Sequence, residues 1–133
     1  LDVGVMKGEN AMFLLEKDTG NKIKKVYGVI SYDPEHKKDF NNYEEILKTN
    51  THGVDRFSLA YIDQSCHVVC IHAHSNLTYN LEKYYAAVKS NGIFCGNEHH
   101  LPRVKEALSS FRRKNKIGTP IMVSNGCWFW IKR

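Results

Sequence analysis

Two groups of residues in this sequence have types and spacing that suit chemistry. The first is the N-terminal run 3–10, in which Gly4 and Gly8 flank a tight turn that follows Asp2. Glycine accepts a positive φ and lets the backbone approach a ligand closely. A helix that begins just after such a turn presents free backbone N–H groups. The pattern favours a nucleotide-like cofactor at the carboxyl edge of a parallel sheet, although a plain strand-to-helix connection would use the same glycines.

The second group follows two expected strands and combines imidazole, amide and carboxylate side chains. Its members are His72, His74, Asn97, Glu98, His99 and His100. Neighbouring strands lie about 5 Å apart, so the two strand ends could converge on one pocket. We predict a histidine general base here, His72, His74 or His99, because imidazole titrates near neutral pH. Two alternatives stay open, namely a divalent metal held by His72, Asn97 and Glu98, and histidines that are simply exposed loop residues.

The length and composition indicate one soluble globular domain. The chain has 133 residues, of which 42% are hydrophobic and 25% charged, enough for a single core. No apolar run approaches the roughly 20 residues of a membrane span, so no membrane partner is expected. The chain begins with Leu1, so we expect that domain 1–133 can be part of a longer polypeptide.

Neither the charge nor the cysteines point to a specialised site. Much of the formal charge of +5 lies in Arg103, Lys105, Arg112, Arg113, Lys114 and Lys116. Without interleaved aromatic residues, a solvated helix face is favoured and nucleic-acid binding is a minor hypothesis. Cys66, Cys70, Cys95 and Cys127 show no paired CxxC spacing, which disfavours a cysteine–zinc site. They are interpreted as small apolar side chains in a reducing compartment, which predicts a cytoplasmic location.

Strand and helix patterns alternate along the chain. The predicted strands are 1–5, 25–30, 57–62, 67–71, 93–95, 121–124 and 127–131, and the predicted helices are 10–17, 41–48, 77–90 and one opened by Pro102. Asn91-Gly92 is expected to stop the third helix, and Asn125-Gly126 to form a hairpin turn. The alternation predicts an α/β fold, with a mostly parallel sheet flanked by helices and a C-terminal antiparallel hairpin.

Taken in order, these segments resemble class I S-adenosylmethionine-dependent methyltransferases of the small-molecule and sugar O-methyltransferase type, which have a Rossmann-like sheet. The first motif of that family, acid-x-Gly-x-x-x-Gly, is similar to DVGVMKGENAMFLLE at 2–16. The second strand of the family is similar to KVYGVISYDPE at 25–35. The third strand end, the fourth and fifth strands and the terminal strand are similar to AYIDQS, to the run from Val68 to Phe111 and to WFWIKR. The resemblance covers nearly the whole chain.

The resemblance implies S-adenosyl-L-methionine as the cofactor. The implied cofactor site comprises Asp2, Gly4, Gly8, Asn10, Asp33, Gln64 and Ser65. In the family the glycines approach the methionine part, the first acid engages the ammonium group, and the residues at the third strand end lie near the adenine. Asp33 would replace a ribose-binding acid whose place is taken here by Ile30.

Three departures from the family pattern affect the expected chemistry. The acid at the end of the fourth strand is His72, the His-Asp pair after the fifth is Asn97-Glu98, and no helix fits between Ser65 and His67. Some relatives bind magnesium at these two strand ends, so the resemblance implies a possible Mg or Mn ion. Replacing an acid by His72 weakens the magnesium case, because magnesium prefers oxygen ligands.

The activity implied by the resemblance is methyl transfer to a hydroxyl group of a small molecule or sugar. The lost acids favour a different class of function, a degenerate domain that binds a cofactor or partner without catalysis. A metal-dependent hydrolase built on the histidines ranks last, because a paired ligand motif such as HExxH is missing.

Overall fold

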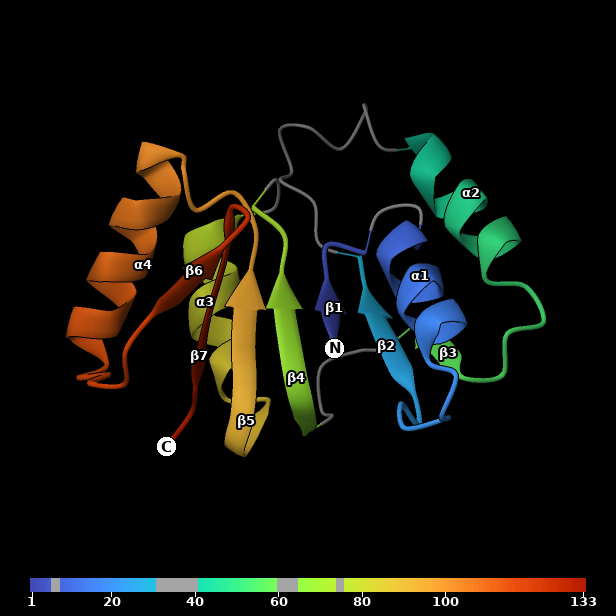
Figure 1. Ribbon diagram of the computed structural model, residues 1–133. Helices are drawn as coiled ribbons and strands as arrows, with labels where there is room; N and C mark the ends of the chain where they lie inside the picture. Colours follow the sequence, from blue (N-terminus) through green and yellow to red (C-terminus); the bar gives the residue numbers. More distant parts are fainter. Residues whose placement is uncertain (6–7, 31–40, 60–64, 74–75) are drawn as a thin grey trace.

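The computed structural model describes residues 1–5, 8–30, 41–59, 65–73 and 76–133, and for residues 41–44 it describes the backbone only. A seven-stranded sheet forms the centre, with the strand order β3-β2-β1-β4-β5-β7-β6 (Figure 1). The strands are β1 (Asp2–Val3), β2 (Val26–Val29), β3 (Phe57–Leu59), β4 (Cys66–Ile71), β5 (Val88–Gly96), β6 (Met122–Ser124) and β7 (Cys127–Ile131). β1 to β5 pair in parallel, whereas β7 runs antiparallel to both β5 and β6. The predicted fold class is therefore confirmed.

Four described helices connect these strands. They are α1 (Glu9–Lys17), α2 (Asn41–Asn50), α3 (Leu77–Tyr85) and α4 (Pro102–Lys114). In α4 the buried side chains Val104, Leu108 and Phe111 recur at the spacing of one helix face, and Pro102 opens the first turn. Its basic side chains are exposed or half-buried, as a solvated helix face requires. No helix in the described part of the chain is long and apolar enough to cross a membrane.

An aromatic cluster fills the space between the sheet and helices α3 and α4. Phe94 lies at the centre, with its ring 5.2 Å from that of Trp130 and 5.7 Å from that of Trp128. Tyr85 of α3 and Phe111 of α4 meet edge to face at 5.4 Å. Trp128 and Trp130 are fully buried, so these tryptophans are packing residues and β7 is held firmly to β5.

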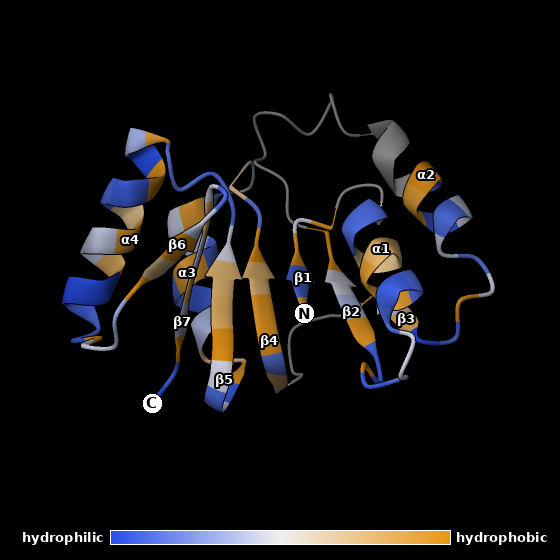
Figure 2. Ribbon diagram, in the orientation of Figure 1, coloured by the Kyte–Doolittle hydropathy of each residue, from blue (hydrophilic) through white to orange (hydrophobic). Residues whose placement is uncertain are grey.

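The two faces of the sheet are covered unequally. Helices α3 and α4 pack on the face that carries the aromatic cluster, while α1 packs beside β1 and β2 through Ala11 and Leu15. On the other face of β4 and β5, Val68 and Ile93 are 46% and 38% exposed. Figure 2 shows the apolar colour running along these two strands, and no described helix crosses in front of them. Because a parallel sheet is normally covered on both faces, this side of β4 and β5 stands out as open.

The helix predicted for 77–90 is wrong at its C-terminal end. Helix α3 ends at Tyr85, and Asn91-Gly92 lies inside β5 instead of stopping a helix. Asn91 has a φ of 61°, and a Cβ on Gly92 would lie 2.8 Å from the carbonyl oxygen of His67. The pairing of β4 and β5 shifts register between Cys66 and Val68. The dipeptide therefore lies at an irregularity of the strand pair. Asn91 takes up the positive φ there, and Gly92 leaves room for the neighbouring strand.

The hairpin predicted at Asn125-Gly126 is confirmed. Both residues have positive φ, 49° and 76°, and they join β6 to β7. Two consecutive positive φ angles match the twist of a tight antiparallel hairpin. Of the predicted strand 57–62, β3 confirms Phe57–Leu59, and residues 60–62 lie outside the described part.

Candidate functional site

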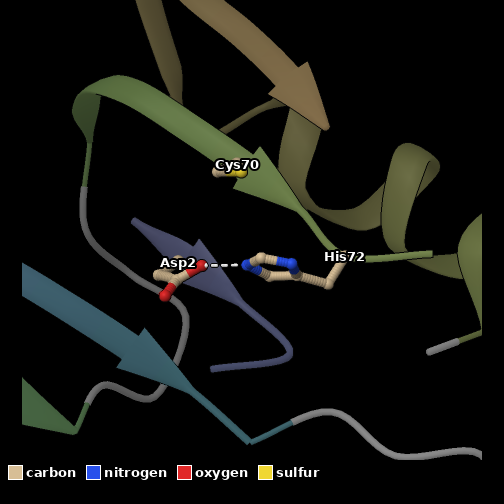
Figure 3. A group of neighbouring side chains, drawn as sticks. All are labelled: Asp2, Cys70 and His72. Carbon is tan, nitrogen blue, oxygen red and sulfur yellow. Dashed lines mark hydrogen bonds and ion pairs between the residues drawn. The ribbon is translucent and has the colours of Figure 1, made fainter. Parts of the chain in front are cut away.

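The site lies where β1 and β4 run side by side. Asp2 is in register with Cys70, and the His72 N–H continues this ladder by donating to the Val3 carbonyl at 3.0 Å. Cys70 and His72 are two residues apart, so they point to the same face of the sheet as Asp2. Figure 3 shows the three side chains gathered on that face.

The closest contact in the site joins the Asp2 carboxylate to the His72 imidazole. The His72 Nε2 atom lies 2.7 Å from Asp2 Oδ1, and both residues are only 6% exposed. The Asn10 side chain, from the first turn of α1, places its Nδ2 atom 3.4 Å from the same ring nitrogen. The other carboxylate oxygen, Asp2 Oδ2, is buried without a hydrogen-bond partner among the described residues. Asp2 therefore retains one acceptor that nothing in the described protein satisfies.

Asn97 determines which nitrogen of His72 carries the proton. Its side-chain oxygen accepts the Ala73 N–H at 3.0 Å, so its amide nitrogen faces His72 Nδ1 at 3.4 Å. A donor at Nδ1 favours the neutral tautomer in which Nε2–H donates to Asp2. The Asn97 carbonyl in turn accepts the Trp128 indole N–H at 3.1 Å. Trp128 of the aromatic cluster therefore positions the Asn97 backbone, and the Asn97 side chain helps to orient the ring of His72.

The charge of Asp2 governs the protonation of His72. Burial acts to lower the pKa of His72, but the hydrogen bond to Asp2 and its negative charge outweigh burial. The pKa of His72 therefore lies above its ordinary value of 6.5.

We expect the Asp2–His72 contact to stabilise the fold most at acid pH. The pKa of His72 is raised on folding, so its contribution is full below about pH 6.5 and is lost as pH rises through the folded pKa. The difference in unfolding free energy between wild type and His72→Gln should shrink between about pH 6 and pH 8 in urea titrations. His52→Gln, at an exposed histidine, is the control. A difference that stays constant with pH would show that the contact carries no charge.

The glycine turn has the expected backbone but an unexpected neighbour. Gly4 and Gly8 have φ of 84° and 80°, and the Gly4 N–H donates to the Val29 carbonyl at 2.9 Å. A Cβ added to Gly8 would lie 2.7 Å from Leu47 Cδ1 of α2. The positive φ and the contact with α2 therefore both favour glycine at position 8 without any ligand. A substitution there would disturb packing first and cannot isolate cofactor binding.

The remaining predicted cofactor residues are only partly gathered around Asp2. Asn10 is exposed in the first turn of α1 and reaches His72, whereas Ser65 is exposed just before β4. Asp33, Gln64 and His74 lie outside the described residues. These assignments remain predictions.

The predicted residues after β5 have mixed placements. Asn97 meets His72, but Glu98 instead has a carboxylate oxygen 3.5 Å from the Arg103 guanidinium. The backbone N–H of His99, which is half-buried, donates to the Gly126 carbonyl at 2.8 Å. The metal set of His72, Asn97 and Glu98 and the base His99 remain predictions.

Cys70 belongs to the site, and the sequence analysis missed it. Contact with the Cys95 thiol, followed by burial, raises the pKa of the Cys70 thiol well above its ordinary range. The signal was present as Cys70-Ile71-His72, because two potential ligands at i and i+2 on a strand share one face. A search for CxxC spacing does not detect it.

Neither protein-family models nor curated proteins match this chain. Solved structures match it at low sequence identity. The O-methyltransferase NovP is 14% identical, with 98% of this chain and 70% of that chain covered at a TM-score of 0.67. A precorrin-6y C5,15-methyltransferase from Geobacter metallireducens GS-15 is 13% identical, with 98% and 75% covered at 0.66. A ribosomal protein L11 methylase from Lactobacillus delbrueckii subsp. bulgaricus is 14% identical, with 99% and 69% covered at 0.62.

The names of these three structures differ in the acceptor that is methylated, while their fold is shared with this chain along almost its whole length. The chain has the fold of class I S-adenosylmethionine-dependent methyltransferases.

Proposed function

We propose that this chain transfers a methyl group from S-adenosyl-L-methionine to a hydroxyl group of a small molecule or sugar. The observation that carries the proposal is the buried Asp2 Oδ2 atom, an acceptor without a partner among the described residues. Asp2 is the first residue of the two-residue strand β1, so it lies close to the carboxyl end of that strand, and Gly4 and Gly8, both with positive φ, follow before α1. Ligands of open α/β sheets bind outside the carboxyl ends of the strands, which is this position.

The residues present suit the donor in charge and in backbone shape. The Asp2 carboxylate would accept a hydrogen bond from the donor's ammonium group through Oδ2, while Oδ1 stays on His72. Gly4 and Gly8 have the positive φ that the turn requires, and Asn10 adds a polar group at the start of α1. Asp33, Gln64 and Ser65 complete the proposed donor site on the grounds of family resemblance. When bound, the donor supplies an electrophilic methyl group.

The protein's own part in the reaction is to orient the acceptor and to take up its proton. A histidine near the carboxyl ends of β4 or β5, His72, His74 or His99, is the proposed base. His72 already directs both ring nitrogens at neighbours, Nε2 at Asp2 and Nδ1 at Asn97. Its lone pair would become available only if the Asn97 amide moved away.

We expect Asp2→Asn to weaken S-adenosylhomocysteine binding by about 10- to 100-fold. A hydrogen bond to a charged group contributes about 1.5–3 kcal/mol, and about 1.4 kcal/mol corresponds to tenfold in affinity. Isothermal titration calorimetry at neutral pH measures the change. Asp55→Asn, which removes an exposed carboxylate in the turn before β3, should leave the affinity unchanged.

A matched variant separates loss of charge from loss of the imidazole contact. His72→Gln removes the ring but keeps the Asp2 carboxylate, so it should retain most of the affinity that Asp2→Asn loses. Equal binding by Asp2→Asn and wild type would remove Asp2 from the donor site.

One observation favours a second candidate, a domain that binds the donor without transferring its methyl group. Both ring nitrogens of His72 already contact a neighbouring side chain, Nε2 contacting Asp2 and Nδ1 contacting Asn97. These contacts suit a structural role for the imidazole better than a role as a proton acceptor. The two candidates differ in one result. A degenerate domain would bind S-adenosylhomocysteine but, when given S-adenosyl-L-methionine with a labelled methyl group, would transfer no label to catechols or glycosides offered as acceptors.

A further inference from the structure

Three metal-binding side chains from two strands that are distant in sequence converge on one face of the sheet. Asp2, Cys70 and His72 each offer a ligand atom, and these atoms all lie within 4.8 Å of one another (Figure 3). The strand register produces this arrangement, because Asp2 pairs with Cys70 and His72 follows two residues later. The ligands therefore come from rigid elements of the fold.

We propose that Asp2, Cys70 and His72 bind a divalent transition metal of the zinc type. A second, independent observation supports a ligand here, because Asp2 is 6% exposed and its Oδ2 atom is buried without a partner among the described residues. An unsatisfied buried carboxylate oxygen is costly, and a cation is the partner that would satisfy it best.

The donor set selects the kind of metal. A thiolate and an imidazole suit Zn²⁺ or Co²⁺, whereas Mg²⁺ requires oxygen ligands. Zinc lies about 2.3 Å from sulfur and about 2.0–2.2 Å from nitrogen or oxygen, so two ligand atoms of one ion are at most about 4.5 Å apart. Ligand atoms already within 4.8 Å need only small side-chain rotations to reach such an ion. Three protein ligands leave a fourth position for water.

Metal binding changes the protonation of Cys70 and His72. The Cys70 thiol loses its proton to solvent when sulfur becomes a thiolate ligand. The proton on His72 Nε2 is replaced by the metal, and the neutral ring then carries its proton on Nδ1. Nδ1 now faces the Asn97 amide nitrogen at 3.4 Å, so the amide must rotate to offer its oxygen. One proton is released for each metal bound to the neutral ring, and two are released where His72 starts as the imidazolium.

The open face of β4 and β5 offers a route for the ion. Cys70 is half-buried on the face where Val68 and Ile93 are exposed. The site shares Asp2 with the proposed donor site, so metal and donor would compete for one carboxylate. The metal site itself does not depend on methyl transfer.

The test is a titration of the reduced protein with Co²⁺, followed through the thiolate-to-cobalt charge-transfer band in the near ultraviolet. We expect one equivalent of Co²⁺ to produce the band, added Zn²⁺ to remove it, and Cys70→Ala to abolish it. Cys127→Ala, at an exposed cysteine of β7, should behave as wild type. Absence of the band in wild type, or its persistence in Cys70→Ala, would overturn the proposal.

A second variant keeps the test decisive if Cys70→Ala fails to fold. Asn97→Asp supplies a carboxylate oxygen to the Nδ1–H of a metal-bound His72, as the outer partners of metal-bound histidines commonly do. We expect it to bind Co²⁺ about tenfold more tightly than wild type, the lower end of the usual effect of such partners. Affinity equal to or below that of wild type would contradict a metal on His72 Nε2. The titration uses no methyl donor, so its outcome is independent of the proposed methyl transfer.

Discussion

Changing the responsible histidine to alanine should slow methyl transfer by about 10²–10⁴-fold, the usual contribution of a general base. The candidates are His72, His74 and His99. If His72 is the base, the rate of the wild-type enzyme should also fall as pH drops through the pKa of His72, which the contact with Asp2 raises above the ordinary value of 6.5. Transfer of labelled methyl from S-adenosyl-L-methionine to a hydroxylated acceptor measures the rate, and calorimetry should show nearly unchanged donor binding.

His52→Ala, at an exposed position remote in sequence from the strand ends, is the control for this series. The histidine-base idea is wrong if single substitutions at all three candidates leave turnover unchanged. Restoration of a lost rate by added manganese would assign the same residue to a metal.

We expect Gly96→Ala to destabilise the protein by more than about 3 kcal/mol, beyond the usual range for overpacking a core. A Cβ on Gly96 would lie 2.5 Å from the Ile71 carbonyl oxygen and would overlap the ring of Trp128. The backbone cannot yield, because Gly96 pairs with Ile71 on one side and with Trp128 on the other. Urea unfolding followed by circular dichroism would measure the loss.

Gly118→Ala is the matched control, because a Cβ at that position meets nothing within 4 Å. Its unfolding midpoint should stay close to that of wild type. Should the two variants be equally stable, β4, β5 and β7 would have to be packed less tightly than their contacts imply. The site would then lose its support, because Asn97 follows Gly96 directly and is held by Trp128.

The sequence predicted the layers of the fold better than the local irregularities. Alternating strand and helix patterns predicted the parallel sheet, and Asn125-Gly126 predicted the hairpin, because both signals are local. The helix end predicted at Asn91-Gly92 was wrong, because the same dipeptide suits both the end of a helix and an irregularity within a strand. Only the backbone of the neighbouring strand, which approaches Gly92 closely, decides between the two roles.

The site was predictable in its residue types but not in its contacts. The sequence indicates Asp2 through the glycine turn that follows it and His72 through the polar residues at a strand end. Their contact joins residues that are 70 positions apart in the sequence. That contact depends on the register of β1 against β4, which periodicity alone does not specify. Cys70 was not predicted for the same reason. It becomes a potential ligand only because the strand register places Asp2 opposite it.

Calorimetric titration of the wild-type protein with S-adenosylhomocysteine is the decisive measurement of whether this chain uses S-adenosyl-L-methionine. We expect saturable binding of one molecule per chain, weakened in Asp2→Asn and unaffected in Asp55→Asn. Binding should also raise the unfolding temperature, because a ligand that binds only the folded state stabilises it. No heat of binding and no thermal shift at millimolar ligand would show that the protein does not bind this cofactor.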